Sequence, residues 1–169
     1  MSDRRLEGDG QAPFPEIRLL TCDDWRTVRE GRLAALKDAP DAFLTADPHE
    51  ATWTEGQWRE SCDTGDWVVA QLDGRVVATT RLARQGEYPY VESVWTAADY
   101  RRRGIASELV RQLVKAQRQR RAGEIRVWVF SPNPAAFQFY ASLGFEPTGT
   151  RQLIDGTRME ERLRLIDAG

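Results

Sequence analysis

The segment from residue 101 to residue 107 carries the most distinctive chemistry in the sequence. It reads Arg-Arg-Arg-Gly-Ile-Ala-Ser and stands between an apolar segment and a long amphipathic helical pattern. The first turn of a helix presents unpaired backbone N–H groups and the positive end of the helix dipole. Gly104 and Ala106 keep that backbone bare, so an anion can approach it, and nearby guanidinium groups add charge-assisted hydrogen bonds. The segment therefore predicts a site for a phosphate or diphosphate, although three arginines before a helix would also suit a merely solvated surface.

Other readings of this arginine segment are weaker. It is not the phosphate loop of nucleotide hydrolases, because no Gly-Lys-Ser or Gly-Lys-Thr follows it. A nucleic-acid site would need interleaved aromatic residues and a wider basic surface, whereas the net charge of the chain is −2. We expect no nucleic-acid partner.

The rest of the sequence shows no recognisable arrangement of residues for covalent or metal catalysis. The single histidine, His49, falls in an expected loop, and no Ser/His/Asp or Cys/His arrangement is recognisable. Cys22 and Cys62 lack the spacing of metal ligands. We expect no metal site, and we expect both thiols to be reduced.

The composition is that of a globular protein. A length of 169 residues fits one domain, and no apolar run approaches the ~20 residues of a membrane span. Residues 1–16 are polar and rich in glycine and proline, without the apolar core of an export signal. We expect residues 1–16 to form a disordered tail and residues 17–169 to form a single domain, located in the cytoplasm and without a membrane partner.

The apolar periodicity changes along the chain and predicts alternating strands and helices. Strands are predicted at residues 17–20, 67–72, 76–82, 88–95 and 125–130, with a closing hairpin around residues 155–156 whose second strand is 158–165. Helices are predicted from residue 23 through 36, from 54 to before 65, at 104–121 and at 134–143. Asp73 and Gly74 favour a tight hairpin turn, and Asn133 suits a helix cap. This order predicts a mixed α/β layer architecture.

Two segments together resemble the GCN5-related N-acetyltransferase (GNAT) family. Arg101-x-x-Gly104-x-Ala106 matches the family's Arg/Gln-x-x-Gly-x-Gly/Ala signature, and residues 94–104 are similar to its strand-loop-helix segment. Residues 133–145, Asn-Pro-Ala-Ala-Phe-Gln-Phe-Tyr-Ala-Ser-Leu-Gly-Phe, follow in the family's order and at its usual separation. The resemblance is sharp from about residue 92 to residue 149 and looser elsewhere.

This resemblance implies the α/β (α+β) fold of acyl-CoA N-acyltransferases. That fold has a mixed central sheet of about six or seven strands, helices on both faces and a splayed pair of parallel strands. Acetyl-CoA is then the co-substrate, with its pantetheine arm in the gap between the splayed strands and its diphosphate on the loop backbone. The matching cofactor-binding positions are Val94, Trp95, Thr96, Arg101, Arg102, Arg103, Gly104, Ile105, Ala106, Ser107 and Asn133. Asn133 would equally suit a role as a helix cap alone.

The resemblance also implies direct attack of an amine on the acetyl thioester in a ternary complex. Tyr140 matches the position that commonly protonates the departing sulfur, although it would also suit packing beside Phe137 and Leu143. Glu92 is the candidate base, directly or through a water, provided that burial raises its pKa; it would otherwise be a substrate-orienting carboxylate or a plain charge at the strand edge. Backbone N–H groups near Val94 would polarise the thioester carbonyl.

The sequence does not identify the acceptor. Residues 38–54 and 152–156 are the expected acceptor loops, with Phe43 and Trp53 as candidate walls or, equally, as local core anchors. The partner is expected to be a small-molecule or peptide amine, with a homodimer as a further expectation. A non-catalytic acyl-CoA sensor, or a transferase of longer acyl groups, is the alternative, and an interaction module using the arginines is a weaker one.

Overall fold

The computed structural model describes residues 13–166 apart from 44–45, 85, 121–122 and 155. In this part of the chain, seven strands form one mixed sheet in the order β1-β2-β3-β4-β5-β7-β6. They are β1 (Glu16–Leu19), β2 (Gly65–Leu72), β3 (Arg75–Ala83), β4 (Tyr90–Thr96), β5 (Glu124–Ser131), β6 (Glu146–Ile154) and β7 (Arg158–Ile166). Strands β4 and β5 pair in parallel, whereas the other neighbours pair antiparallel. The mixed sheet expected from the sequence is confirmed.

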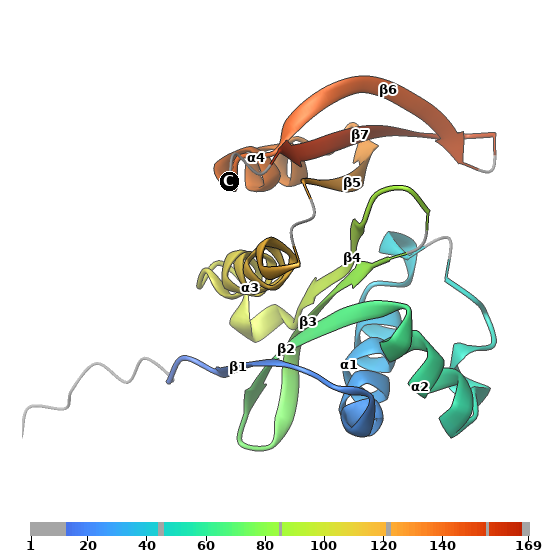
Figure 1. The fold of residues 1–169 in the computed structure, drawn as a ribbon, viewed down its shortest axis with the longest axis vertical. Coiled ribbons are helices and arrows are strands. Elements are labelled where there is room, and N and C mark those ends of the chain that lie inside the picture. The colour runs from blue at the N-terminus through green and yellow to red at the C-terminus, as the bar shows by residue number, and fades with distance from the viewer. Residues whose placement is uncertain (1–12, 44–45, 85, 121–122, 155, 167–169) are drawn as a thin grey trace, which may run out of the picture.

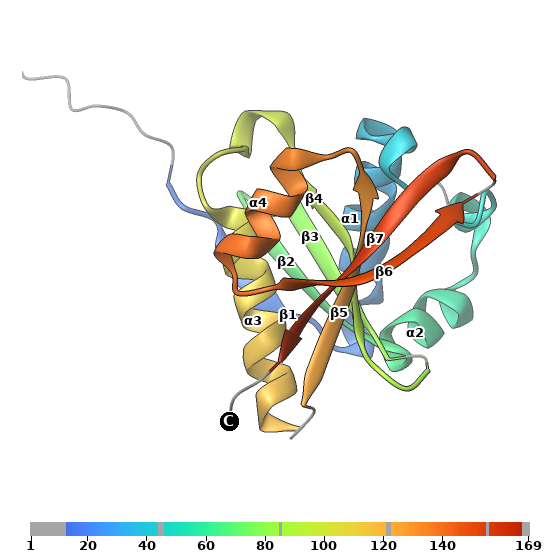
Figure 2. The same cartoon turned by 90° about the horizontal axis from the view of Figure 1, so that it is seen from above.

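Helices cover both faces of this sheet (Figures 1 and 2). Helices α1 (Trp25–Asp38) and α2 (Glu55–Asp63) lie on one face, and α3 (Ile105–Gln119) and α4 (Pro134–Ser142) lie on the other. Single 3-10 turns occupy Cys22–Asp24, Pro40–Ala42, Glu50–Thr52 and Ala98–Tyr100. The predicted helices are present, but the first begins later than expected because residues 22–24 form a 3-10 turn.

Local sequence signals account for several of these boundaries. Asp73 and Gly74 have φ values of 50° and 76°, the paired positive φ angles that a tight hairpin turn between antiparallel strands requires. Thr54 begins α2 with a capping box, because its hydroxyl accepts from the Gln57 N–H while the Gln57 side chain accepts from the Thr54 N–H.

The buried core lies in two layers, one on each face of the sheet. Between the sheet and α1 and α2, the core includes Val28, Trp58 and Trp67. The larger layer, on the α3 and α4 face, takes residues from both halves of the chain, including Leu109 and Val127. The strands on either side of the β4–β5 junction therefore rest on one continuous apolar layer.

Strand β4 contains a bulge at Ser93. The register between β3 and β4 shifts between Thr79 and Arg81, and Ser93 adopts a φ of 56° although it is not a glycine. A bulge leaves one residue unpaired and bends its strand. The Ser93 hydroxyl accepts a hydrogen bond from Arg32 at 3.1 Å, and the Glu92 carbonyl accepts one from Thr80 at 3.2 Å. These contacts hold the bend in place.

Of the tail predicted at residues 1–16, residues 1–12 lie outside the described residues. The carbonyl of Pro13 accepts a hydrogen bond from Arg103 at 3.1 Å, and β1 begins at Glu16.

Candidate active site

The parallel strands β4 and β5 part after a short contact. Only Tyr90 and Arg126 pair across them, and the Arg126 N–H bonds to the Pro89 carbonyl at 2.9 Å. Beyond Tyr90 no residue of β4 pairs with β5, so the β4 backbone edge facing β5 is left open. The expected splay of the parallel pair is present, and in Figure 2 the two strands cross at an angle instead of running side by side.

A cavity of about 760 Å³ opens at this divergence. Its walls include Val94 from β4, Trp128 from β5 and Asn133 and Tyr140 from the α4 region. Phe43 and Trp53 from the expected acceptor loop, and Gln152 from the β6 end, line it as well. The cavity therefore joins the side of the sheet that carries α4 to the side that carries α1 and α2.

The loop before α3 leaves its backbone accessible. Gly104 is the N-cap residue of α3 with a φ of 78°, and no side chain caps the helix there. A Cβ added at Gly104 would meet no atom of the described residues within 4 Å, apart from its own chain neighbours. The first intrahelical bond runs from the Glu108 N–H to the Gly104 carbonyl at 3.1 Å, so the N–H groups of Ile105, Ala106 and Ser107 have no partner within the helix.

The three arginines of the loop differ in their surroundings. Arg101 donates to the Thr96 carbonyl at 2.9 Å and to the Asp38 carboxylate at 2.8 Å, so its guanidinium binds the loop to α1. Arg102 is exposed with a φ of 60°. Arg103 bonds to the Pro13 carbonyl and lies over the Tyr100 ring at 5.7 Å. Arg101 and Arg102 are both exposed, and of the three only Arg102 forms no hydrogen bond or ion pair with the described residues.

The predicted residues 94–96 occupy the end of β4 with different side-chain environments. Val94 is half-buried and lines the cavity. The buried indole of Trp95 donates to Asp38 at 2.9 Å, which directs the ring toward α1. The Thr96 hydroxyl is buried without a hydrogen-bond partner among the described residues. Trp95 and Thr96 can therefore offer mainly backbone groups to the gap.

Tyr140 is buried at the wall of the cavity. The residue is 7% exposed, and its ring makes edge contacts with the rings of Phe139 and Phe145, at centroid distances of 4.9 and 5.4 Å. No described residue forms a hydrogen bond with its hydroxyl. Burial raises the pKa of Tyr140 well above the usual value of a phenol, so the group remains a neutral O–H donor.

Asn133 is the N-cap residue of α4. Its side-chain oxygen accepts from the Ala136 N–H at 3.1 Å, which leaves the side-chain NH₂ group free of that bond. Because Asn133 also lines the cavity, the capping role is compatible with a contact to a ligand.

Glu92 lies on the cavity wall but is not buried. Its side chain is 46% exposed and forms an ion pair with Arg81 at 2.6 Å. The burial on which a role as base was conditional is therefore not present. Arg81 also bonds to the Thr64 hydroxyl at 2.8 Å, so the pair holds the carboxylate in a defined place.

The buried ion pair between Arg32 of α1 and Glu50 was not predicted from the sequence. Their side chains form two hydrogen bonds of 2.8 and 2.9 Å, and Arg32 also lies over the Phe43 ring at 5.0 Å. The pair connects the acceptor loop to the Ser93 bulge. One signal was available, because Arg32 falls on the helical stripe of Val28 and Ala35, where an arginine is unexpected.

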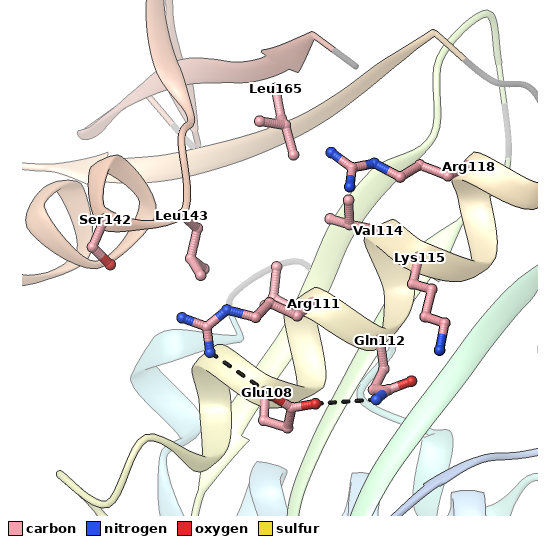
Figure 3. Close-up of a pocket in the computed structure, with 10 residues that line it drawn as sticks. Glu108, Arg111, Gln112, Val114, Lys115, Arg118, Ser142, Leu143 and Leu165 are labelled. Carbon is pink, nitrogen blue, oxygen red and sulfur yellow. Dashed lines mark hydrogen bonds and ion pairs between the residues drawn. The ribbon is translucent and has the colours of Figure 1, made fainter. Parts of the chain in front are cut away.

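A second cavity, of about 440 Å³, lies between α3, the end of α4 and β7 (Figure 3). Arg111 and Lys115 of α3 line it, together with Leu143 and Leu165 from the opposite side. Glu108 accepts from Gln112 at 3.0 Å and pairs with Arg111 at 3.8 Å. None of the predicted site residues lines this cavity, so it is separate from the β4–β5 site.

Within the described ranges, no three His, Cys, Asp or Glu side chains are grouped to hold a metal ion. No helix of the described part is long and apolar enough to cross a membrane.

Solved structures share this fold. The ribosomal-protein-alanine N-acetyltransferase of Brucella melitensis superposes with a TM-score of 0.68 at 23% identity, covering 89% of this chain and 99% of that one. The PaiA N-acetyltransferase of Thermoplasma acidophilum, solved with coenzyme A, superposes with a TM-score of 0.62 at 17% identity, covering 87% of this chain and 96% of that one.

Sequence comparison identifies the family. An uncharacterized N-acetyltransferase of Methanocaldococcus jannaschii is 24% identical over 115 residues, which is 63% of this chain and 50% of that protein. The chain thus spans about half the length of this curated relative. The model of the acetyltransferase (GNAT) family matches residues 32–145, well over half of the chain. With the splayed strands and open helix start in place, the chain belongs to the GNAT family of acetyltransferases, which use acetyl-CoA as co-substrate.

Proposed function

We propose that this protein is an N-acetyltransferase that moves the acetyl group of acetyl-CoA to a primary amine in a ternary complex. One observation carries the proposal: an accessible helix start adjoins a parted pair of strands, and a cavity runs from that divergence past Tyr140 to the acceptor loops. A donor and an acceptor can therefore reach one reacting centre from opposite sides of the sheet.

The part of the site next to the start of α3 fits the pyrophosphate and the pantetheine arm of the donor, acetyl-CoA. The unpaired N–H groups of residues 105–107 and the space above Gly104 suit the pyrophosphate, with the Arg102 side chain as a counter-charge. The open backbone of residues 94–96 and the Asn133 side chain suit the amides of the pantetheine arm. Arg101 and Arg103 contribute by holding the loop. Bound acetyl-CoA would supply the acetyl thioester.

Tyr140 is the proposed acid. Because burial keeps its phenol protonated, it can donate a proton to the sulfur as the C–S bond breaks, and the thiol then leaves as CoA. Backbone N–H groups near Val94 would stabilise negative charge on the carbonyl oxygen.

Glu92 is the proposed base. Its half-exposed carboxylate, held by Arg81, favours a water between it and the amine over direct contact. The amine nitrogen forms the new C–N bond, and its proton passes through that water to Glu92. Each turnover then exchanges one C–S bond for one C–N bond, and a proton moves to the leaving sulfur.

The acceptor class is a primary amine, small or peptidic. The Brucella relative is named for acetylating an alanine of a ribosomal protein, which supports an amine acceptor. The homodimer and the cytoplasmic location remain predictions.

Release of CoA thiol over a panel of primary amines tests the proposal, with tertiary amines, which cannot form a neutral amide, as the matched negative control. We expect thiol release with at least one primary amine and none with tertiary amines. Acetyl-CoA binding without thiol release from any amine would indicate an acyl-CoA sensor instead. Comparison of acetyl-CoA with longer acyl-CoAs as donors distinguishes an acetyltransferase from a transferase of longer acyl groups.

A further inference from the structure

Glu160 of β7 is a buried carboxylate in the wall of the acceptor cavity. The residue is 8% exposed, and it lies opposite Phe130 of β5 and Gln152 of β6 in the sheet. The Gln152 side-chain NH₂ donates to Glu160 Oε2 at 3.0 Å. Gln152 is neutral, so this contact orients the carboxylate without compensating its charge.

No described residue forms an ion pair with Glu160. Arg162, two residues along the same face of β7, instead donates to the hydroxyls of Thr148 and Thr150 at 3.3 and 2.9 Å. Arg158, two residues before Glu160 on the same face of β7, donates to the Asp41 carbonyl at 3.4 Å. The neighbouring guanidinium groups are therefore directed elsewhere.

The other carboxylates of this cavity have partners. Glu50 pairs with Arg32, Glu92 pairs with Arg81, and Asp47 accepts from the His49 N–H at 2.8 Å and the Trp53 indole at 3.2 Å. The cavity is lined by two arginines and four carboxylates, so its walls carry an excess of negative charge. A buried carboxylate without a cation is costly, which makes a cationic ligand the natural partner of Glu160.

We propose that Glu160 binds a second positive charge on the acceptor, so that the preferred substrate is a small dicationic amine. This inference rests on the proposed acetyl transfer, in which one amine of the acceptor reacts as the free base. The second, still protonated, would bond to the Glu160 carboxylate oxygen that Gln152 leaves open. The contact between Arg158 and Asp41 joins the β6–β7 turn to the acceptor loop, which favours a small acceptor over a folded polypeptide.

The test compares straight-chain α,ω-diamines, from propanediamine to octanediamine, with n-alkylamines of the same chain length. For the wild-type protein we expect kcat/KM to favour the best diamine over its monoamine by about tenfold or more, as for a charge-assisted hydrogen bond. Glu160→Gln keeps the shape and the contact with Gln152 but removes the charge. It should abolish most of this preference while the affinity for acetyl-CoA stays unchanged.

Glu161→Gln is the matched control. Glu161 is the next residue on the same strand and is equally buried at 8% exposure, but it points to the opposite face and pairs with Arg151 at 3.1 Å. It should keep the diamine preference. Glu160→Asp retains the charge on a shorter side chain and should shift the optimal diamine toward a longer chain.

Equal use of diamines and monoamines by the wild type, or an unchanged preference in Glu160→Gln, would overturn the role of Glu160 while acetyl transfer stands. If no amine releases thiol, the proposed function fails, and calorimetry in the presence of CoA still decides the inference. Diamine binding that Glu160→Gln weakens about tenfold or more supports it, and the absence of diamine binding to the wild type refutes it.

Discussion

At the scale of single residues, the hydroxyl of Tyr140 combines burial with a place on the cavity wall. Tyr140→Phe keeps the ring contacts with Phe139 and Phe145 and removes only a hydroxyl that bonds to no described residue. We expect kcat to fall by about 100-fold or more, the usual contribution of a general acid, with stability changed by less than about 1 kcal/mol. Steady-state kinetics and thermal unfolding measure these two effects.

The pH dependence provides a control for this assignment. The acceptor amine must lose a proton, so kcat/KM should rise with pH. Burial raises the pKa of Tyr140 above the ordinary value of 10.0, so the proposed acid stays protonated up to that pH. The plot of kcat/KM against pH should therefore show no falling limb below about pH 10. A full kcat in Tyr140→Phe would leave Tyr140 as a packing residue only.

Gly104 allows a second residue-scale prediction. Gly104→Glu should abolish acetyl-CoA binding, because it places bulk and negative charge in the space that we propose for the pyrophosphate. Gly74→Glu is the control, since Gly74 has a similar φ of 76° and equally open surroundings but lies in the β2–β3 turn. The free energy of unfolding of both variants should fall by about 1–2 kcal/mol, because a residue with a side chain is strained in the left-handed backbone conformation. Calorimetry measures the affinity of both variants for acetyl-CoA. A loss of affinity in both variants, or in neither, would contradict the placement of the pyrophosphate at Gly104.

Residues with local determinants could be predicted from the sequence. A glycine before an amphipathic helix and an asparagine before a proline indicate a helix start and its cap, and Gly104 and Asn133 occupy those places. The pairs of Glu50 with Arg32 and of Glu160 with Gln152 could not be predicted. They depend on loop placement and on strand register, which no local pattern contains.

At the scale of elements, the buried Arg32–Glu50 pair fixes the acceptor loop against α1. Glu50→Gln leaves Arg32, whose side chain is 11% exposed, without its counter-charge, and should lower the free energy of unfolding by roughly 3 kcal/mol. Thermal or denaturant unfolding measures the loss. The double variant Arg32→Met with Glu50→Leu removes both charges and should recover most of it.

The exposed pair of Arg59 with Glu55 is the control for that measurement. Its side chains are 38% and 50% exposed, and solvent screens the pair. Glu55→Gln should therefore lower the free energy of unfolding by less than about 1 kcal/mol. An equal cost for the two single variants, or a double variant as unstable as Glu50→Gln, would show that burial of the charge does not set the effect.

Helices and strands could be predicted from apolar periodicity because each buries a regular set of side chains. Strand β2 is buried on both faces, and the hairpin turn at Asp73 and Gly74 fixed its boundary with β3. The splay of β4 from β5 came from the family resemblance instead. The bulge at Ser93 could not be predicted, because serine has no preference for a φ of 56° and is held there by Arg32.

At the scale of the whole molecule, the sheet has a weak junction above a shared core. Strand β4 pairs with β5 in the sheet at a single position, whereas residues such as Val91, Leu109 and Val127 pack in one apolar layer beneath both halves. A ligand lying in the gap would contact both halves and so add bonds where the backbone makes few. Binding of CoA should therefore stabilise the junction as well as the loop that we propose as its phosphate site.

CoA at about 100 times its Kd should stabilise the protein by about 2.7 kcal/mol, which raises Tm by roughly 5–10 °C. Hydrogen exchange should slow at residues 94–96 of β4, which border the gap, and at residues 104–107 before and within α3. The β1–β2 pair, at the far edge of the sheet from the gap, serves as the internal reference and should not change. Gly104→Glu should show neither effect. Protection confined to residues 104–107 would mean that CoA rests on the helix start alone, and the gap between β4 and β5 would then have no part in binding the donor.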